Sequence, residues 1–562
     1  MIKSARTAFG VMLLPMLLTS CASLPAPESL SSAMGGPEKA VMKTAGDIPP
    51  APQHIWPDIS QDLNDRRADG FGLVPMPEME RYLNGLLLKI KTISGTTGWP
   101  GSVHITAETS LKASSSPAGN IFISIGWLQS AESEDEIFAI LSHEYGHIYL
   151  NHYAVYDVKN AGDSTALLAG VTWSIVNRNV ADHGWNGLDK IAVVQTIGST
   201  ILIPAWQRHI EEQADLFGAT VSLRCNYSYI HGFKAFLERI DTYDRQAKER
   251  DEKLREAQND AIHAKIRNET LASAAKSPPP PVVASDAAAP LQALAGINDA
   301  LSKLNEALID GQVNLKQKTF DATQAVDNAI ATGAAVIRDT HPEGAAREDD
   351  LSKEVVSLLP ARRPAPRIKP WEAAKNQPET RLILSHYALI PQIEMLQAQR
   401  RYPLALKLAQ QAASGPTLND GMPDFYLGNL MALAHVSGKP TASQIFMRNL
   451  ASRERSWKLQ MALAHAMLAE NRELAQNYVQ QQFAYFGEAP ATWPDVIAFY
   501  RDSGDLKRSK DMATACSLRM PSYRQSCLAM SQTPAEIAEM KTKTDAHAKM
   551  IVENVSKRWF KQ

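Results

Sequence analysis

Two histidines and a glutamate stand at a spacing that suits metal-dependent hydrolysis. His143 and His147 are four residues apart, and Glu144 follows the first of them. On a helix, residues four apart lie one turn above each other, so both imidazoles can reach one metal ion. Zinc catalysis needs fixed nitrogen ligands, an open coordination position and a base beside the water that occupies it. The pattern therefore predicts a zinc site with Glu144 as the general base.

A third ligand is expected 64 residues after His147, within the segment 208–215. Glu211 of this segment completes a His-His-Glu set and leaves a fourth position for water. Glu212 and His209 are rival ligands from the same segment. We favour Glu211 because it alone has an aspartate four residues later, at the offset of a partner that orients a ligand.

That aspartate is Asp215, which can accept the second ring N–H of a ligand histidine, most naturally His143. Ala214 and Gly218 are small residues at close-packing offsets of the same predicted helix. A surface helix with scattered charges would not account for them. Both segments together predict a zinc peptidase.

The elements that must position these residues can be read from hydrophobic periodicity. Apolar residues recur at helical spacing over 134–149, with Ser133 as a plausible N-cap and Glu136 as its capping-box partner. A second helix is expected over 78–92. His152, five residues after His147, is expected to be a structural residue at the helix end and not a ligand.

Two short strands are also expected, one over 103–106, where the residues alternate, and a second over 120–125, just before the zinc helix. In a peptidase, an edge strand can pair with an extended substrate and supply backbone hydrogen bonds regardless of its side chains. The sheet is therefore expected to be small and to lie beside the zinc helix.

The combined pattern resembles the HtpX/BepA-like gluzincin metallopeptidases, a family that includes the CAAX prenyl endopeptidases. The resemblance rests on His-Glu-x-x-His at 143–147 and on Arg-x-x-Glu-x-x-Ala-Asp-x-x-Gly at 208–218. Residues 119–128 resemble the strand and turn that precede the family's zinc helix. The sequence departs from the family at Gln213, where a glutamate is often found, and in a long insertion before Thr340.

Thr-His-Pro at 340–342, with Arg347 five residues after the proline, resembles a further family segment that reaches the cleft. The resemblance implies that His341 acts at the zinc. It would either stabilise the oxyanion during turnover or occupy the fourth zinc position as a latch. An ordinary surface histidine is the third possibility.

The predicted fold class is α+β and mostly helical: a zincin-like peptidase domain with a small sheet, followed by an all-α repeat domain. The peptidase domain spans 61–358 and contains a helical, low-complexity insertion at about 243–335. Residues 359–375 are proline-rich and are expected to form a linker. Residues 376–562 are expected to be helical repeats, and hydrolysis of short peptides is expected to survive deletion of residues 371–562.

The repeat prediction rests on four small residues at matching positions, Ala405, Ala442, Ala475 and Ser509. Their intervals of 37, 33 and 34 residues are close to the tetratricopeptide period. Stacked repeats would present a concave surface to a protein partner or an unfolded client.

The N-terminus reads as a lipoprotein signal peptide over 1–20. Lys3 and Arg6 precede a short apolar stretch, and Leu-Thr-Ser-Cys resembles a lipobox that ends at Cys21. Acylated Cys21 would anchor the chain, and Ala22 after it points to the outer membrane under the sorting rule of such lipoproteins. Residues 21–60 are expected to be a flexible tether.

Three further cysteines remain in a chain expected to reach the oxidising periplasm. Cys516 and Cys527 lie in adjacent predicted helices and are the natural disulfide pair, and Cys225 is expected to be a buried thiol. The apolar stretch 167–206 is interrupted and flanked by charges, so it is expected to form two buried or lid-like helices and not membrane spans.

We therefore predict a periplasmic endopeptidase, anchored to the outer membrane, that binds one zinc ion per chain. Its expected substrates are unfolded or misassembled envelope proteins, and its repeats are expected to reach outer-membrane assembly machinery. A net charge of −2 gives no electrostatic reason to expect nucleic-acid binding. The alternative is a periplasmic chaperone or assembly scaffold that works through its repeats and has a latched or weak peptidase.

Overall fold

The structure is a computed structural model that describes residues 40–153, 203–246, 249, 267, 344–434, 440–520, 523–533 and 535–536. The chain forms two compact units, one of Met1–Glu238 with Ala345–Gln562 and one of Arg239–Gly344. Nearly all described residues belong to the first unit. Several predicted features lie outside the described residues: the signal peptide, Cys21, most of the 167–206 stretch, most of the 243–335 insertion, and His341.

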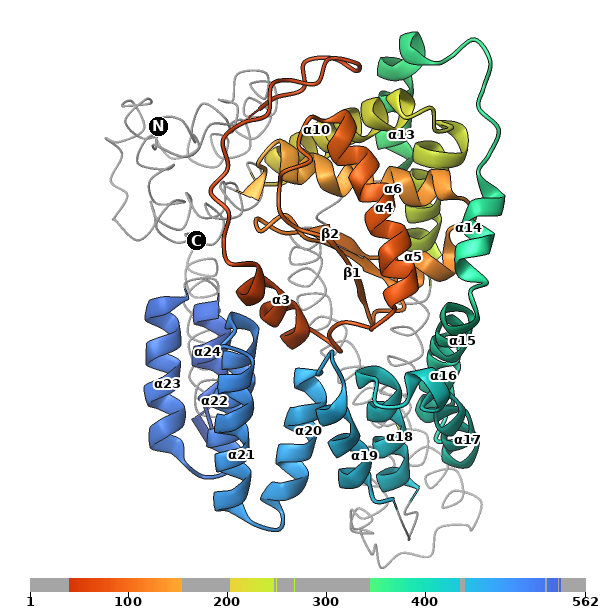
Figure 1. Cartoon of the computed structure of the whole chain (residues 1–562). Helices are drawn as coiled ribbons and strands as arrows, with labels where there is room; N and C mark the ends of the chain where they lie inside the picture. Colours follow the sequence, from red (N-terminus) through yellow and green to blue (C-terminus); the bar gives the residue numbers. More distant parts are fainter. Residues whose placement is uncertain are drawn as a thin grey trace, which may run out of the picture. The chain divides into compact units, whose positions relative to one another are not determined.

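A three-stranded sheet lies at the centre of the peptidase part (Figure 1). It consists of β1 (Val103–Thr106), β2 (Ala113–Ser115) and β3 (Ile121–Ser124), in the order β1-β3-β2. β1 runs parallel to β3, and β2 runs antiparallel to it. Periodicity indicates β1 and β3 but not β2, because Ala-Ser-Ser carries no strand preference. β2 forms one edge of the described sheet.

The longest buried helix carries the two histidines. α6 (Glu134–Tyr149) is buried at every residue, as expected for a helix that is covered on all sides. The Ser133 hydroxyl caps it by accepting the backbone N–H of Glu136 at 3.2 Å. The Glu136 carboxylate in turn accepts the backbone N–H of Glu132 at 3.0 Å. The start of the histidine helix is therefore fixed from both sides.

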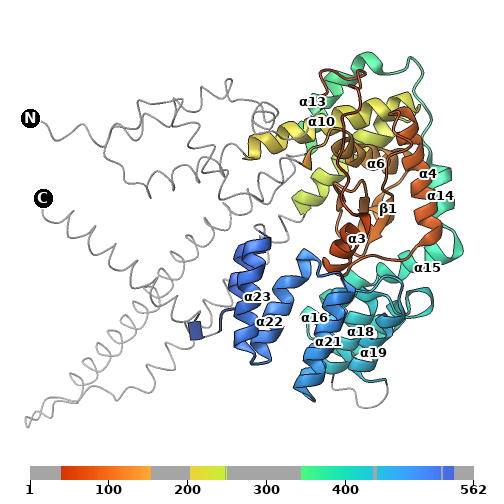
Figure 2. The same ribbon diagram turned by 60° about the vertical axis from the view of Figure 1, so that its left-hand side comes forward.

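Further helices surround α6 and the sheet. α10 (Ile203–Arg224) packs along α6, and α4 (Pro77–Ile93) packs on both α6 and β1 (Figures 1 and 2). The same part also contains α3 (Ile59–Ala68), α5 (Ile125–Ser130), the π-helix η4 (Ile230–Lys234), α13 (Gly344–Val355), the 3-10 helix η5 (Val356–Leu358) and α14 (Ile368–Lys375).

The expected tether does not extend as far as residue 60. Met42 is buried, its N–H donates to the Gln213 side-chain oxygen at 2.5 Å, and the Gln213 amide returns a bond to the Met42 carbonyl at 3.0 Å. Gly46 N–H donates to Thr220 Oγ1 at 3.0 Å. Residues 40–46 are therefore fixed along α10, because their backbone groups find partners on that helix.

The expected linker at 359–375 is also corrected, because its last eight residues form α14. The Trp371 indole is fully buried and donates to the Ala131 carbonyl at 2.7 Å. The backbone N–H of Arg367, just before α14, donates to Asp135 at 2.6 Å. A proline-rich composition conceals this helix, whose place depends on tertiary contacts with the region around the start of α6.

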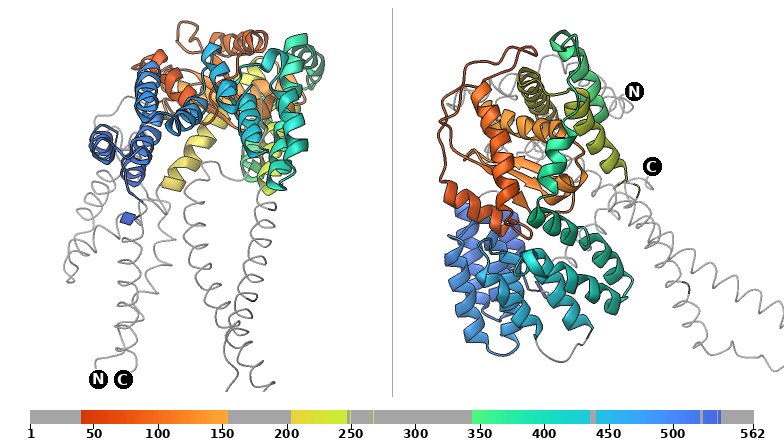
Figure 3. Two further views of the ribbon diagram at one scale, coloured as in Figure 1. Left: turned by 90° about the horizontal axis from the view of Figure 1, so that it is seen from below. Right: turned by 45° about the vertical axis from the view of Figure 1, so that its right-hand side comes forward.

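The C-terminal part is a series of helices, and from residue 390 onward consecutive α-helices pack against each other (Figures 1 and 3). They are α15 (Pro378–Tyr387), α16 (Ile390–Ala398), α17 (Tyr402–Ala412), η6 (Gly415–Thr417), α18 (Gly421–Leu433), α19 (Ala442–Arg448), η7 (Asn449–Ala451), α20 (Trp457–Leu468), α21 (Arg472–Tyr485), η8 (Pro490–Thr492), α22 (Trp493–Asp502), α23 (Leu506–Arg519) and α24 (Arg524–Met530). The fold class is thus α+β and mostly helical, as predicted.

The small positions of the repeat agree with the helices in three cases out of four. Ala405, Ala475 and Ser509 are each the fourth residue of a helix, α17, α21 and α23, and all are fully buried. The equivalence of Ala442 is wrong, because Ala442 is the first residue of α19 and Ile445 takes the buried fourth position. Spacing alone cannot detect a shift of helix start.

The described cysteines are Cys225, Cys516 and Cys527. Cys516 and Cys527 form a disulfide between α23 and α24, beside the apolar side chains of Trp493 and Ile497. Cys225 is free and half-buried, so it is more exposed than expected. Among the described helices, none combines the length and the apolar character that a membrane crossing requires.

Candidate metal centre

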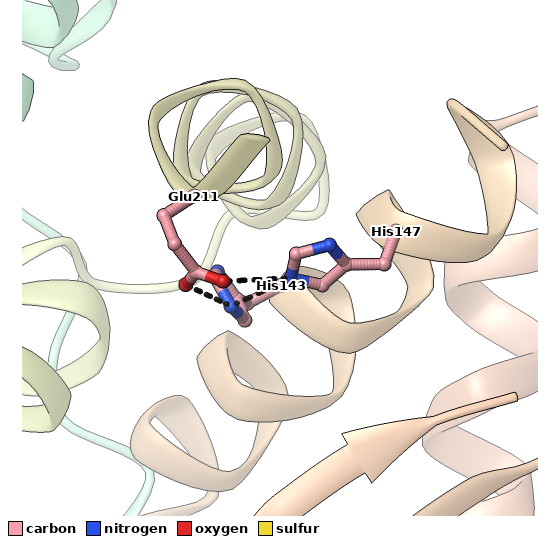
Figure 4. Close-up of side chains that lie close together, drawn as sticks. All are labelled: His143, His147 and Glu211. Atoms are coloured by element: carbon pink, nitrogen blue, oxygen red, sulfur yellow. Dashed lines mark hydrogen bonds and ion pairs between the residues drawn. The ribbon is translucent and has the colours of Figure 1, made fainter. Parts of the chain in front are cut away.

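Helices α6 and α10 bring His143, His147 and Glu211 together (Figure 4). The two Nε2 atoms of the histidines lie 3.2 Å apart. Glu211 places Oε2 at 3.4 Å from the Nε2 atom of His143, and Oε1 at 3.6 Å from that of His147. All three side chains are buried. The three residues favoured from the sequence therefore converge at one point.

The spacing of these donor atoms fits a tetrahedral zinc ion. Ligand atoms at 2.0–2.1 Å from a tetrahedral zinc are separated from one another by about 3.3–3.4 Å. The distance between the two Nε2 atoms and the distance from each Nε2 to its nearer Glu211 oxygen are all close to that length, although the two histidines approach different oxygens of the carboxylate. Two imidazole nitrogens and one carboxylate oxygen also form a donor set that catalytic zinc uses, with the fourth position open.

The rival ligands lie elsewhere on α10. His209 Nδ1 and Glu212 Oε2 are 4.0 Å apart, and their side chains are 37% and 55% exposed. Glu211, by contrast, is 2% exposed. A helix separates successive residues by about 100° around its axis, so neighbours of an inward-facing glutamate point elsewhere. The structure thus brings only Glu211 of the three to the two histidines.

Asp215 orients His143. The Nδ1 atom of His143 donates to Asp215 Oδ1 at 2.9 Å, which leaves the Nε2 lone pair directed toward the candidate metal position. Asp215 itself is 2% exposed. The offset of four residues between Glu211 and Asp215 places both carboxylates on the same side of α10.

Arg347 from α13 closes this network. Its Nε and Nη2 atoms donate to the two oxygens of Asp215 at 2.9 and 2.8 Å, and Nη2 lies 3.3 Å from Glu211 Oε2. Arg347 is buried, so its charge compensates carboxylates that have little access to water. The family resemblance marks Arg347 in the sequence but assigns it no contact, which only the fold reveals.

The electrostatics favour a cation between these carboxylates. Burial lowers the pKa of His143, but its hydrogen bonds to Asp215 and Glu211 outweigh burial and raise that pKa to about 10. Burial raises the pKa of Asp215, but Arg347 and His143 outweigh burial and lower it below its ordinary value. Without a metal, the His143 imidazole therefore carries an additional proton and a positive charge. A divalent ion would supply positive charge in its place.

Glu144 stands next to the first ligand and is buried. Its Oε2 atom accepts a hydrogen bond from Ser115 Oγ at 3.0 Å. Ser115 is the last residue of the edge strand β2. A carboxylate at this place can take a proton from a water held at the site. Ser115 was not identified from the sequence, because β2 has no strand signature there.

Glycines allow α6 and α10 to approach closely. A Cβ atom on Gly218 would lie 2.6 Å from Phe233 Cζ and 2.8 Å from the backbone N of His143. A Cβ atom on Gly146 would lie 3.1 Å from the Ala214 carbonyl oxygen. The small residues noted in the sequence therefore set the distance between the two ligand-bearing helices.

Comparison with known families agrees with this geometry. Residues 101–355 match the family model described as peptidase family M48. Residues 101–355 are therefore similar to an M48 peptidase domain. The match begins just before β1, ends at the last residue of α13, and includes His143, His147 and Glu211. No curated protein matches the chain.

The match supports the prediction of a metallopeptidase, since M48 peptidases are zinc metalloproteases. The site residues fit that assignment, with two histidines, a glutamate and a neighbouring carboxylate at the expected places. His341 and Cys21, which were also predicted from the sequence, lie outside the described residues.

Proposed function

We propose that this protein is a zinc-dependent endopeptidase of the cell envelope, HtpX/BepA-like in the order of its parts. The observation that carries the proposal is the convergence of His143, His147 and Glu211, whose donor atoms lie 3.2–3.6 Å apart, with Glu144 next to His143 in the chain. The proposed substrates are unfolded or misassembled envelope proteins. An extended chain could pair with the outer edge of β2 and bring a peptide bond toward Glu144.

The chemistry follows from the residues around the site. Zinc held by His143, His147 and Glu211 would supply Lewis-acid activation of a water and of the scissile carbonyl. Glu144 takes the proton of the water and returns it to the leaving amine. Asp215 and Arg347 keep His143 in the correct tautomer and compensate the buried charge.

The location rests on the sequence. A lipobox-like segment ending at Cys21 supports an acylated anchor, and Ala22 supports the outer membrane. The disulfide Cys516–Cys527 is consistent with an oxidising compartment. Replacing Cys21 with Ser should release the protein into the soluble periplasmic fraction. Continued tight membrane association would count against the anchor.

The C-terminal helices are proposed to be tetratricopeptide-like and to dock clients or outer-membrane assembly machinery. The buried small residues Ala405, Ala475 and Ser509 support this, since each lies at the same place in its helix. His341 is proposed to act at the zinc, as latch or oxyanion donor, on the sequence resemblance alone.

The test is hydrolysis of an unstructured protein by purified wild type and by Glu144→Gln. The variant should keep one zinc per chain and the same melting temperature, while kcat falls by at least about 100-fold, the lower range for losing a general base. Glu211→Ala should lose zinc.

Equal cleavage by wild type and Glu144→Gln would refute the mechanism. A wild type that holds zinc and suppresses aggregation of an unfolded client without cleaving it would favour the alternative, a chaperone or assembly scaffold.

A further inference from the structure

The edge strand β2 contacts different partners on its two faces. Successive side chains of a strand point to opposite faces, so Ser115 faces α6 and Glu144, while Ser114 faces away. On that opposite side lies α3. Arg66 of α3 donates to Ser114 Oγ at 3.1 Å, and its guanidinium lies 4.4 Å from the ring centre of Phe122, the residue that pairs with Ser114.

A second contact fixes the end of β2. Asp62 of α3 accepts hydrogen bonds from Ser116 Oγ and Asn120 Nδ2, both at 2.7 Å. The two residues that flank Ser115 are therefore each bound to α3. β2 has three residues and pairs with β3 alone among the described strands, so its own ladder gives it little rigidity.

The same helix is anchored in the C-terminal helices (Figure 1). Arg67 forms a two-pronged bond with the Glu454 carboxylate, at 2.6 and 3.3 Å. Asp65 accepts the backbone N–H of Ala491 at 3.0 Å. Ala68 packs in the core that contains Trp457 and Phe486. One side of α3 thus contacts the C-terminal helices and another holds β2.

We propose that Ser115 is a positioning residue for Glu144, and that α3 fixes Ser115 from the far side of the sheet. This proposal rests on the proposed peptidase function. The Ser115 hydroxyl donates to one carboxylate oxygen and so restricts the rotation of a side chain that must meet a water in one orientation. A misplacement of about 1 Å at such a group can cost roughly 100-fold in rate.

Loss of the Ser115 hydroxyl should affect the rate of turnover and not the binding of substrate. Removing the Ser115 hydroxyl leaves the backbone of β2, which would pair with substrate, unchanged. The loss should therefore fall on kcat and not on KM. A threonine at 115 keeps the hydroxyl and suits a strand, so Ser115→Thr should restore most of the lost activity.

The experiment measures kcat and KM on a short unstructured peptide for wild type, Ser115→Ala, Ser115→Thr and Glu144→Gln. Ser115→Ala should lower kcat about 10-fold or more with KM within about twofold. Ser385→Ala is the matched control, because Ser385 is exposed on α15 and bonds only within that helix. Zinc content and melting temperature are measured for every variant.

The role of α3 is tested by a double-mutant cycle. Asp62→Ala should also lower kcat, and Asp62→Ala combined with Ser115→Ala should be little worse than Ser115→Ala alone, because α3 acts through Ser115. If the decreases in kcat caused by Asp62→Ala and Ser115→Ala were fully additive, the proposed role of α3 would be overturned. That result would show that α3 stabilises the sheet independently of Glu144.

The failures are distinguishable. If wild type cleaves, Glu144→Gln does not, and Ser115→Ala matches wild type in kcat, the positioning role is refuted while the peptidase function stands. An equal loss in Ser115→Ala and Ser115→Thr also refutes it, since the hydroxyl is then not the cause. A wild type that cleaves no peptide refutes both proposals.

Discussion

The Nδ1 atoms of His147 and His152 lie 2.9 Å apart, and both residues are buried. The contact arises because α6 ends at Tyr149 and Asn151 adopts a left-handed backbone with φ of 56°, which folds His152 back over the last turn. His152 N–H also donates to the His147 carbonyl at 3.1 Å. If His147 binds a metal through Nε2, its Nδ1 carries the proton and donates it to His152.

His152→Ala should therefore weaken zinc binding by about 10–100-fold, as expected for losing the partner that orients a ligand histidine. Competition with a chelator of known affinity measures this directly. His231→Ala is the control, because the His231 side chain is exposed. Equal zinc affinity in the two variants would show that His152 is only a helix-end residue, as the sequence suggested.

The sequence predicts the metal ligands and Asp215 but not the contacts of His152 and β2 with the site. The periodicity of α6 and the offsets of Glu211 and Asp215 are local features, so the ligand set and its aspartate partner can be predicted. His152 could not be assigned, because its contact depends on the left-handed turn at Asn151. β2 could not be predicted either, because its neighbours and not its residue types make it a strand.

α3 and α14 were missed for a related reason. The α3 sequence is polar, and its contacts are mainly ion pairs and hydrogen bonds from residues such as Asp62 and Arg67. A search for an apolar stripe therefore finds nothing there. In α14, the buried residues are Trp371 and Ala374, and two positions in a short helix give no periodicity.

Gly218→Ala should destabilise the protein by about 1–3 kcal/mol, because the added methyl group overpacks against Phe233 and the backbone of His143. The control is Gly85→Ala. Gly85 lies in α4 with no atom within 4 Å of an added Cβ, so this change should stabilise by about 0.5–1 kcal/mol. Urea unfolding with and without chelator measures both. A Gly218→Ala variant with an unchanged free energy of unfolding would contradict the close approach of α6 and α10.

Two buried aspartates, the N-cap residue Asp420 and Asp424 in the first turn of α18, should make stability depend on pH. Burial and the charge of Asp424 raise the pKa of Asp420 to about 8. Burial also raises the pKa of Asp424 to about 7, although Arg448 lies 4.0 Å away and partly opposes this. A carboxyl with a pKa above its unfolded value of about 3.9 holds a proton in the folded state that the unfolded state releases.

Stability should therefore fall as pH rises between about 4 and 8, by roughly 1–3 kcal/mol relative to a variant without these groups. Asp420→Asn combined with Asp424→Asn is that variant. Urea unfolding of both proteins at roughly pH 5 and pH 8 gives the four free energies. The difference between the proteins should change with pH, and a constant difference would show that neither aspartate is protonated in the folded state.

The structure reverses the expectation that residues 371–562 can be removed without harm to peptide hydrolysis. Trp371 is fully buried and donates to the Ala131 carbonyl, two residues before the N-cap of α6. Ala68 packs among C-terminal residues and Arg67 is bound to Glu454, so truncation also exposes α3. We now expect the truncated chain to lose peptide hydrolysis and to melt at lower temperature.

Trp371→Ala in the full chain separates the loss of the Trp371 contact from the exposure of α3. Burying a tryptophan contributes about 3–5 kcal/mol, so this change alone should lower the melting temperature strongly. A truncated chain that keeps wild-type kcat on a short peptide would restore the view that the C-terminal helices are a separate docking domain.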